Sequence, residues 1–260
     1  MHGSEPQGHV LVSHPATGVA LVEINRPSAR NAMNAATVAA LGQTLTTLDT
    51  DPGIRAVVLA GVGGDLSAGR DMRGMRGRGM GCLGDAGGRR GGAQMEALGV
   101  PMMGGGDGMA LGAGLELALL ADWIVVGPDA RLGLPELTLG VMPGDGGTQR
   151  LARAIGQGPA LRLILTGEIF DAGRAAALGL ADAAPGGARA DAIGQAARIA
   201  AMAPLAARMA KRTVRAGLEA PLATGLALEA RGLELLFATA DQREGMAAFV
   251  EKRRARFEGR

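Results

Sequence analysis

The chain has 260 residues, of which 47% are hydrophobic and 20% are charged, a composition typical of a soluble globular protein with one large domain or one domain and an appendage. Aromatic residues make up only 2% of the chain, so aliphatic side chains must fill the core and any binding pocket. The formal net charge of +2 is too small to imply a nucleic-acid partner by itself, and the single cysteine, Cys82, excludes an internal disulfide.

The inventory of reactive side chains disfavours several chemistries. The three histidines, His2, His9 and His14, lie in or before the first strand region, which argues against a histidine-centred triad and against a zinc site. No glycine-rich stretch ends in the Lys-Ser/Thr of a phosphate-binding loop, and the dinucleotide fingerprint is missing. Carboxylates, backbone groups and water remain for proton chemistry, and we expect no metal.

The location of the protein is also indicated by what the sequence lacks. No apolar run approaches the ~18 to 20 residues of a membrane span, and residues 1–18 show no basic segment followed by an apolar one. A lone cysteine suits a reducing compartment. We therefore expect a cytoplasmic protein.

The first elements predict an α/β fold. Residues 18–24 (GVALVEI) alternate as a strand does and end at the turn 25–27. Asn34 is a suitable N-cap for a helix whose apolar residues recur at helical spacing until the Asp-Pro-Gly break at 51–53. Residues 55–60 (RAVVLA) form a second, more buried strand, and strand, helix and strand in this order favour α/β architecture.

Two different segments follow the second strand. The small residues of the turn 67–71 (SAGRD) let the backbone approach a ligand and expose N–H groups. Residues 73–92 form a glycine- and arginine-rich loop with three open interpretations: a phosphate-binding loop, a solvated loop without a fixed partner, or an RNA-binding segment, which the lack of aromatic residues disfavours.

The stretch from residue 100 to residue 126 contains a predicted anion receptor. A strand begins at 100–103, residues 104–108 turn, and a helix runs over 111–121 from the small residues Gly112-Ala113-Gly114. Such a helix start presents unpaired N–H groups and the positive end of the helix dipole. Residues 123–126 form the next strand.

Two glutamates lie in otherwise apolar runs. Glu116 falls in the first turn of the helix over 111–121, and Glu136 follows Pro135, which suits the first position of a short helix. A buried carboxylate must be paired, hydrogen-bonded or neutralised, so these positions suggest a function. For Glu116 a purely structural interpretation, stabilisation by the helix dipole, stays open.

The C-terminal part is predicted to be helical. From residue 190 the chain is rich in alanine; Pro204 opens one helix and Gly217 closes it, Pro221 opens the next, and Asp241 with Glu244 forms a capping pair for the last. An apolar face that suits packing or subunit contact is formed by Leu226, Leu233, Leu236 and Phe237.

The ordered segments SAGRD, DGMALGAGLELALLAD, ARLGLPELTLGVMPGDGGTQRLARAIG and LTGEIFDAGRAAALGLAD closely resemble the enoyl-CoA hydratase/isomerase, or crotonase, superfamily. The resemblance extends over nearly the whole chain. It implies a spiral of strand-strand-helix repeats with the active site in residues 1–189, and a C-terminal helical region, residues 190–260, that assembles trimers or hexamers made of two trimers.

The same resemblance assigns catalytic roles. Backbone N–H groups of Arg70 and Ala113 are expected to form an oxyanion hole for the thioester oxygen, where one donor is worth ~3 kcal/mol of transition-state stabilisation. Glu116 matches the residue that orients and activates water, and Glu136 the residue that exchanges a proton with carbon 2. Gly144 corresponds to a backbone contact near that water.

Contacts to coenzyme A are implied for the turn formed by Ala68, Gly69, Asp71, Met72 and Arg73, and for Arg30. For Arg30 and Arg73, a surface arginine without a ligand role stays an equal alternative. Coenzyme A enters as part of the substrate, so no separate cofactor is expected.

Four residues depart from the pattern of the superfamily. Gly104 and Gly105 replace strand-forming residues, which is expected to weaken the strand by about 1 kcal/mol each. Asp107 stands where asparagine is frequent, and Asp145 adds an acid near the expected water. These departures leave the acyl specificity open.

The sequence therefore predicts an enoyl-CoA hydratase, a carbon-oxygen lyase of fatty acid β-oxidation that adds water to a trans-2-enoyl-CoA. Because members that only isomerise double bonds often keep one of the two acids, the pair favours hydration. The alternatives are an enoyl-CoA isomerase or another crotonase-type reaction, and an RNA-binding homologue that uses the arginine loop.

Overall fold

The computed structural model describes residues 8–72 and 93–260. The arginine-rich loop 73–92 lies outside the described residues, and with it the predictions made for Arg73 and for Cys82. Within the described ranges, none of the helices has the length and apolar character needed to cross a membrane.

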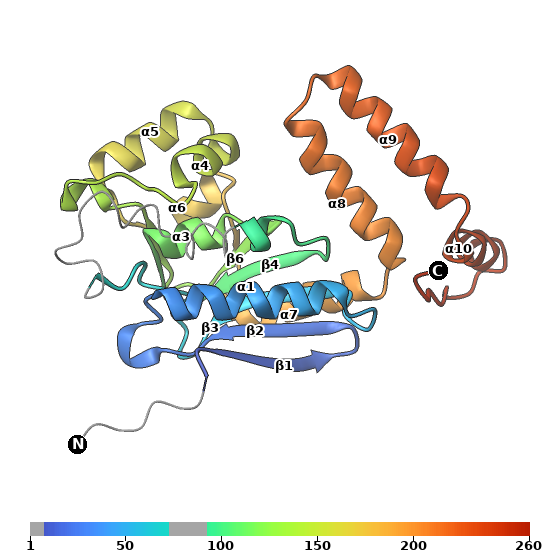
Figure 1. Ribbon diagram of the computed structural model, residues 1–260, viewed down its shortest axis with the longest axis horizontal. Coiled ribbons are helices and arrows are strands. Elements are labelled where there is room, and N and C mark those ends of the chain that lie inside the picture. Colours follow the sequence, from blue (N-terminus) through green and yellow to red (C-terminus); the bar gives the residue numbers. More distant parts are fainter. Residues whose placement is uncertain (1–7, 73–92) are drawn as a thin grey trace.

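A six-stranded sheet forms the centre of the molecule (Figure 1). Its second to sixth strands run parallel, and only the edge strand β1 pairs antiparallel with its neighbour. Apart from Glu23, the buried strands β2 and β3 consist of aliphatic residues and glycine, as expected for parallel strands that are covered on both faces. In spatial order the strands are β1 (Val10–Ala16), β2 (Val19–Ile24), β3 (Ala56–Gly61), β4 (Met102–Gly106), β6 (Trp123–Val126) and β9 (Asp182–Ala183).

Helices cover both faces of this sheet (Figure 1). α1 (Ala35–Thr50) contributes Val38, Leu41 and Leu45 to the larger hydrophobic core on one face. On the opposite face α7 (Ala188–Ala200) packs a row of buried alanines against β2, β3, β4 and β6. Small side chains on α7 allow the helix to approach the sheet closely, which matches the low aromatic content of the chain.

A smaller three-stranded sheet stands beside the first and carries the candidate site. It consists of β5 (Met109–Leu111), β7 (Arg131–Gly133) and β8 (Phe170–Asp171). The helical elements around it are η1 (Pro27–Ala29), α3 (Ala113–Ala118), η4 (Glu136–Leu139), α4 (Gly147–Ile155), α5 (Gln157–Thr166) and α6 (Ala172–Ala177).

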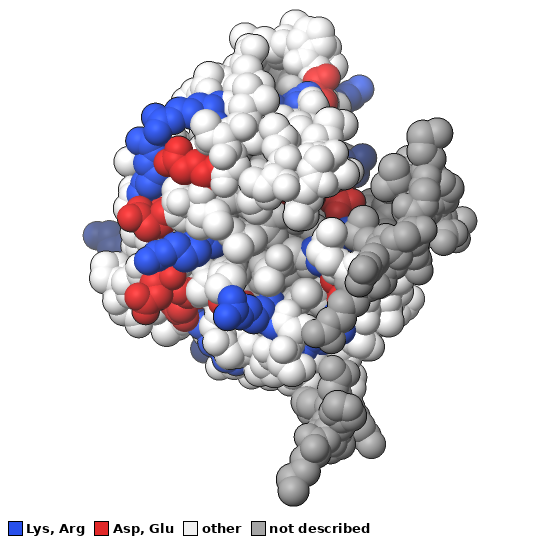
Figure 2. Space-filling model, turned by 90° about the vertical axis from the view of Figure 1, so that its left-hand side faces the viewer, with Lys and Arg blue, Asp and Glu red and all other residues white. Residues whose placement is uncertain are grey.

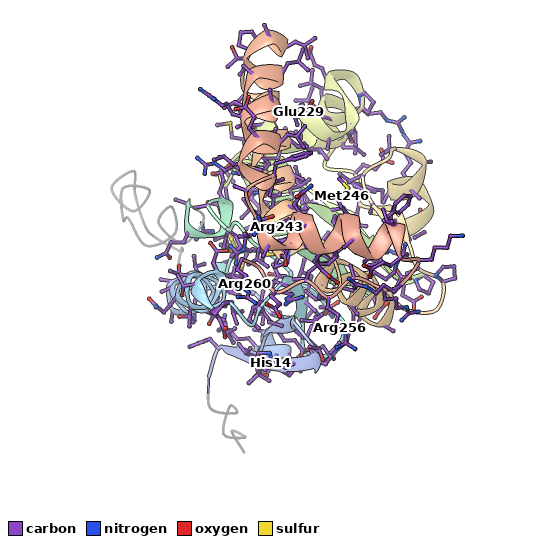
Figure 3. All side chains as sticks on the ribbon, turned by 90° about the vertical axis from the view of Figure 1, so that its right-hand side faces the viewer. His14, Glu229, Arg243, Met246, Arg256 and Arg260 are labelled. Atoms are coloured by element: carbon purple, nitrogen blue, oxygen red, sulfur yellow. The ribbon has the colours of Figure 1, made fainter. Side chains whose placement is uncertain are left out.

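The C-terminal helices form an arm that stands away from the sheets (Figure 1). α8 (Pro204–Leu218) and α9 (Leu222–Leu236) pair as a helical hairpin, and α10 (Ala240–Val250) crosses near its base, with Met246 on α10 and Arg256 on the following tail (Figure 3). Ion pairs attach α8 to the core: Arg208 binds Asp49 at 2.7 Å, and the buried Lys211 binds Asp122 at 2.9 Å.

The structure confirms most of the predicted elements. Asn34 caps α1, since its side chain accepts the Thr37 N–H at 2.8 Å. The predicted α/β architecture with a helical C-terminal region is confirmed as well. The division after residue 189 stays a prediction, although α7, which begins at that point, packs on the central sheet.

Three local predictions are wrong: a turn at 104–108, the extent of the helix over 111–121, and the capping pair of the last helix. Gly104, Gly105 and Gly106 continue β4 instead of turning, because all three pair with β6, and Gly104 also pairs with β3. The helix over 111–121 is shorter, Ala113–Ala118, and starts only after strand β5.

The predicted capping pair of the last helix does not form. Thr239 is the N-cap of α10 and its hydroxyl accepts the Gln242 N–H at 3.1 Å. The side chain of Asp241 instead accepts N–H groups from Glu258 and Gly259, and Glu244 forms an ion pair with Arg253. The C-terminal tail therefore folds back onto α10 and forms contacts with the side chains of both acids.

Candidate active site

The turn 67–71 lies directly against the start of α3. Ser67 donates its N–H to Met109 O and accepts the Leu111 N–H on its own carbonyl, both at 3.0 Å. A Cβ atom added to Gly114 would lie 2.2 Å from Ser67 O, so only glycine allows this contact. The sequence thus folds two backbone segments, 43 residues apart at Ser67 and Ala110, into one bridged unit.

The two predicted oxyanion donors belong to this unit. Arg70 follows Gly69, whose positive φ of 105° requires glycine, and Ala113 is the first residue of α3. A Cβ atom at Gly69 would lie 3.7 Å from Ala113 N, which places the turn next to the N–H of Ala113. The structure therefore brings together the segments that hold these two N–H groups; their role as donors to a substrate stays a prediction.

Glu116 is buried, with 2% of its surface exposed, and its carboxylate faces the turn 143–147. Its Oε1 atom accepts the N–H of Asp145 at 2.8 Å and the N–H of Gly147 at 2.7 Å. Burial raises the pKa of Glu116 above the usual value for a glutamate, while these two N–H donors act in the opposite direction. Bonding on one oxygen leaves Oε2 for another partner.

Glu136 approaches the same place from η4. Its Oε1 lies 3.0 Å from the position of a Cβ atom on Gly112, at the start of α3. Its Oε2 atom is buried and has no hydrogen-bond partner among the described residues. Burial raises the pKa of Glu136, and the negative charges of Glu116 and Asp145 raise it further.

A bidentate ion pair between Arg70 and Asp145 spans the site. The Arg70 Nε and Nη2 atoms donate to Asp145 Oδ2 at 3.0 and 2.6 Å, and Nη2 also donates to Oδ1 at 2.7 Å. The sequence indicated Arg70 only for its backbone and Asp145 only as an additional acid. Nothing in the sequence shows that their side chains meet, because they lie on turns 75 residues apart.

The described residues predicted to contact coenzyme A lie in the turn 67–71 or next to it in space or sequence. Ala68 is half-buried and donates its N–H to Arg30 O at 2.9 Å, and Met72 is exposed. Arg30 adopts a left-handed backbone conformation at the end of η1, with an exposed contact to Met109 Sδ. Gly144 is exposed and immediately precedes Asp145, whose N–H binds Glu116. Ligand contacts of these residues stay predictions.

Asp71 has a structural partner that the sequence did not reveal. Arg26 Nη2 binds Asp71 Oδ2 at 3.1 Å, and the same guanidinium donates to Ala32 O. The Asp71 N–H also donates to Met33 O at 2.9 Å. Arg26 therefore holds the end of the turn 67–71 against the segment that precedes α1.

Charge is unevenly distributed over the side of the molecule drawn in Figure 2. Acidic and basic side chains gather along one edge, whereas the middle of that side is mostly uncharged.

Within residues 8–72 and 93–260, no group of three or more His, Cys, Asp and Glu side chains is arranged to hold a metal ion. Two carboxylates, those of Glu116 and Glu136, lie near the start of α3.

Comparisons with known proteins agree with this geometry. The family model for enoyl-CoA hydratase/isomerase matches residues 15–260. A protein named "Probable enoyl-CoA hydratase" from Rhizobium meliloti (strain 1021) is 44% identical over 246 residues, covering 93% of this chain and 95% of that protein. The "2,3-dehydroadipyl-CoA hydratase" of Escherichia coli (strain K12) is 40% identical over 244 residues, covering 93% and 96%.

Solved structures show the same fold. The crystal structure of an enoyl-CoA hydratase from Bacillus anthracis superposes with a TM-score of 0.93 at 34% identity, covering 97% of this chain and 100% of that chain. The match includes the central sheet, the site-bearing elements and the helical arm, since it spans nearly the full length of both chains. The chain therefore belongs to the enoyl-CoA hydratase/isomerase family.

Proposed function

We propose that the protein is an enoyl-CoA hydratase that adds water to a trans-2-enoyl-CoA and forms a 3-hydroxyacyl-CoA. The observation that carries this proposal is the presence of two nearby carboxylates with different hydrogen-bond partners. Glu116 accepts two N–H groups on Oε1, whereas Glu136 has a buried Oε2 without a partner among the described residues. The names of the relatives from Rhizobium meliloti and Escherichia coli support the same reaction class.

The two carboxylates divide the acid and base roles. Because burial raises the pKa of both and the charge of Glu116 further raises that of Glu136, we expect the two carboxyl groups to hold one proton between them. Glu136 takes the role of proton donor, because burial and then the charges of Glu116 and Asp145 raise its pKa. Glu116 takes the role of base, because the N–H groups of Asp145 and Gly147 stabilise its carboxylate against the burial that raises its pKa.

Hydration then proceeds by one addition and one protonation. A water molecule bonded to Glu116 attacks carbon 3 of the enoyl group, and its proton passes to the Glu116 carboxylate. The electron pair of the double bond moves toward the thioester, whose oxygen becomes an enolate. Glu136 gives its proton to carbon 2, and exchange with solvent restores the starting protonation of both acids.

The backbone N–H groups of Arg70 and Ala113 would stabilise the enolate oxygen. Preorganised donors aimed at a developing charge contribute more than the same donors do in water, because they need not reorient during the reaction. Alanine at position 113 keeps the N–H, and its methyl group narrows the approach. Both donors lie on backbone that Gly69 and Gly114 hold in close contact.

The substrate is proposed to be an acyl thioester of coenzyme A, with no additional cofactor. The half-buried turn 67–71 and the αL residue Arg30 lie side by side, joined by the hydrogen bond from Ala68 N–H to Arg30 O. We propose that this backbone strip, with Asp71 and Met72, borders the coenzyme A portion, and that Gly144 borders the water.

The experiment that tests this proposal follows the absorbance of the enoyl thioester with crotonyl-CoA and with a longer enoyl-CoA, and identifies the product by mass. Hydration increases the product mass by one water molecule. An isomer of unchanged mass would point to double-bond isomerisation instead. Binding of both thioesters without any chemical change, combined with salt-sensitive RNA binding, would replace the hydratase by the RNA-binding alternative.

A further inference from the structure

The Arg70–Asp145 ion pair joins two turns that both contribute to the site. Arg70 belongs to the turn 67–71, and Asp145 belongs to the turn 143–147. The pair uses three short contacts between a planar guanidinium and both carboxylate oxygens, the geometry in which an arginine-carboxylate pair is most directional. Each side chain is about one-third exposed, so the pair is partly accessible to solvent and not part of the core.

The backbone of the same turn holds Glu116. The Asp145 N–H donates to Glu116 Oε1 at 2.8 Å, while the Asp145 side chain points to Arg70. Any shift of Asp145 toward or away from Arg70 therefore also moves one of the two N–H groups bonded to Glu116. A second arginine, Arg150, fixes this turn from its other side, because its Nη1 donates to Asp145 O at 2.9 Å.

The pair also places two opposite charges beside the carboxylates. Among the described residues, the charges that act on Glu116 are those of Asp145 and Arg70, and those that act on Glu136 are the charges of Glu116 and Asp145. Arg150 faces the turn 143–147 but forms its ion pair with Glu96 at 2.7 Å. The net field at Glu116 thus depends on whether Arg70 and Asp145 are both present.

We propose that Arg70 and Asp145 are a positioning pair for the hydration reaction: their side chains hold the turn 143–147 against Glu116 and balance the charge around Glu116 and Glu136. The inference rests on the proposed hydratase function. It assigns to the Arg70 side chain a role separate from that of its backbone N–H. It also gives a reason for an acid at position 145, because an unpaired Arg70 would favour the ionised forms of nearby carboxylates.

The test compares Arg70→Ala, Asp145→Ala, Asp145→Asn and the double variant Arg70→Ala/Asp145→Ala, all of which keep the backbone N–H groups. We expect kcat to fall by about tenfold in each single variant, with KM little changed, because the turn loses its fixed position. The acid limb of the pH profile of kcat should move to lower pH in Asp145→Ala and to higher pH in Arg70→Ala. The double variant should return the limb close to its parental position.

Two variants separate charge from simple tethering. Asp145→Asn keeps a hydrogen bond to Arg70 without the negative charge, and should move the acid limb in the same direction as Asp145→Ala. Arg150→Ala removes a different contact to the same turn, and should leave the position of the limb unchanged. If both single variants moved the limb in one direction, or neither moved it, the pair would be only a structural contact and the proposal would be overturned.

A measurement without turnover keeps this test independent of the proposed function. In the parent, Arg70→Ala and Asp145→Ala, the free energy of unfolding in urea is measured over pH with and without Glu116→Gln. The difference reports where Glu116 titrates in the folded protein. Shifts in opposite directions support the pair even if the parent hydrates no enoyl-CoA; equal titration in all three backgrounds contradicts it.

Discussion

At the scale of single residues, burial opposes the ionisation of Glu116 and Glu136. Both carboxyl groups have raised pKa values, with burial as the largest cause. The folded protein therefore binds more protons than the unfolded chain between the unfolded pKa and the higher folded pKa. In this window the free energy of unfolding falls as pH rises, because each carboxyl must lose its proton in an unfavourable environment.

This argument predicts that removing either charge stabilises the protein. Glu116→Gln and Glu136→Gln should each unfold at higher urea concentration than the parent at neutral pH, at the same protein concentration. The advantage should shrink as the pH falls toward the unfolded pKa of glutamate, since the parent becomes protonated there. Equal or lower stability of both variants at neutral pH would show that the carboxylates are not strained by burial.

The sequence singles out Glu116 and Glu136 as candidate acids, because glutamates inside apolar runs are uncommon and their motifs are specific; their catalytic roles stay predictions. Their environment could not be predicted from the sequence. The bonds from Asp145 and Gly147 to Glu116, and the pair of Arg70 with Asp145, depend on how separate turns meet in space. The pairing of Arg26 with Asp71 was missed for the same reason.

At the scale of elements, the sequence predicts a turn at 104–108, where the structure has the glycines of β4. In the structure, the neighbouring segments explain them. A Cβ atom on Gly105 would lie 3.6 Å from the Cβ of Ala192 on α7, and one on Gly104 would lie 3.4 Å from the Cβ of Ala121. Short side chains let α7 approach the strand from one face and the segment that follows α3 approach it from the other.

A substitution pair tests this view of the glycines. The contact at Gly105 is ordinary van der Waals contact, and its φ angle is not positive, so Gly105→Ala should raise the free energy of unfolding by about 0.5 to 1 kcal/mol. Gly114→Ala should lower it by roughly 1 to 3 kcal/mol, because its Cβ would collide with Ser67 O. Urea unfolding of the two variants checks both signs; a destabilising Gly105→Ala would mean that α7 needs a closer approach than the structure has.

Asp107, a departure from the superfamily pattern, has a structural role at the start of α7. Its position was noted from the sequence as a departure from the superfamily that left acyl specificity open. In the structure, Asp107 Oδ1 accepts the Ala188 N–H at 2.6 Å, at the start of α7, where the preceding Gly187 offers no side chain. Its carboxylate therefore stabilises the N-terminus of the helix that covers the central sheet.

At the scale of the whole molecule, the helical arm exposes many large apolar side chains. Side chains such as Phe249, 85% exposed, and Leu235, 63% exposed, face outward from α10 and α9. Extended apolar surface of this kind is typical of a protein–protein interface. A cavity of about 710 Å³ also lies between α8, the end of α9 and residues 96–99, apart from Glu116 and Glu136.

The exposed surface suits the prediction, implied by the family resemblance, that the arm assembles trimers or pairs of trimers. Light scattering should give a mass at least three times the 26.2 kDa of one chain. Phe249→Glu should lower that mass, because it buries a charge in the contact, whereas Val12→Glu on the outer edge strand β1 should not. A monomeric parent would leave the exposed surface of the arm without this explanation.

The fold class could be predicted because the motifs occur in order along nearly the entire chain. The placement of the arm could not, since α8 meets the core through Arg208, Lys211 and Arg215 and not through an apolar stripe visible in the sequence. Surface leucines on α9 indicated a contact face without indicating what it contacts. Amphipathic spacing alone does not distinguish packing within a chain from packing between chains.

The most direct test of the two-carboxylate mechanism is the rate of hydration of crotonyl-CoA by the parent, Glu116→Gln and Glu136→Gln, with thioester binding measured in parallel. We predict that each variant binds the thioester but hydrates it at least about a hundredfold more slowly, because a general acid or base contributes about 10² to 10⁴ in rate. Glu168→Gln, which alters an exposed ion pair with Arg162, should retain the parental rate. A parent rate retained by either active-site variant would contradict the mechanism.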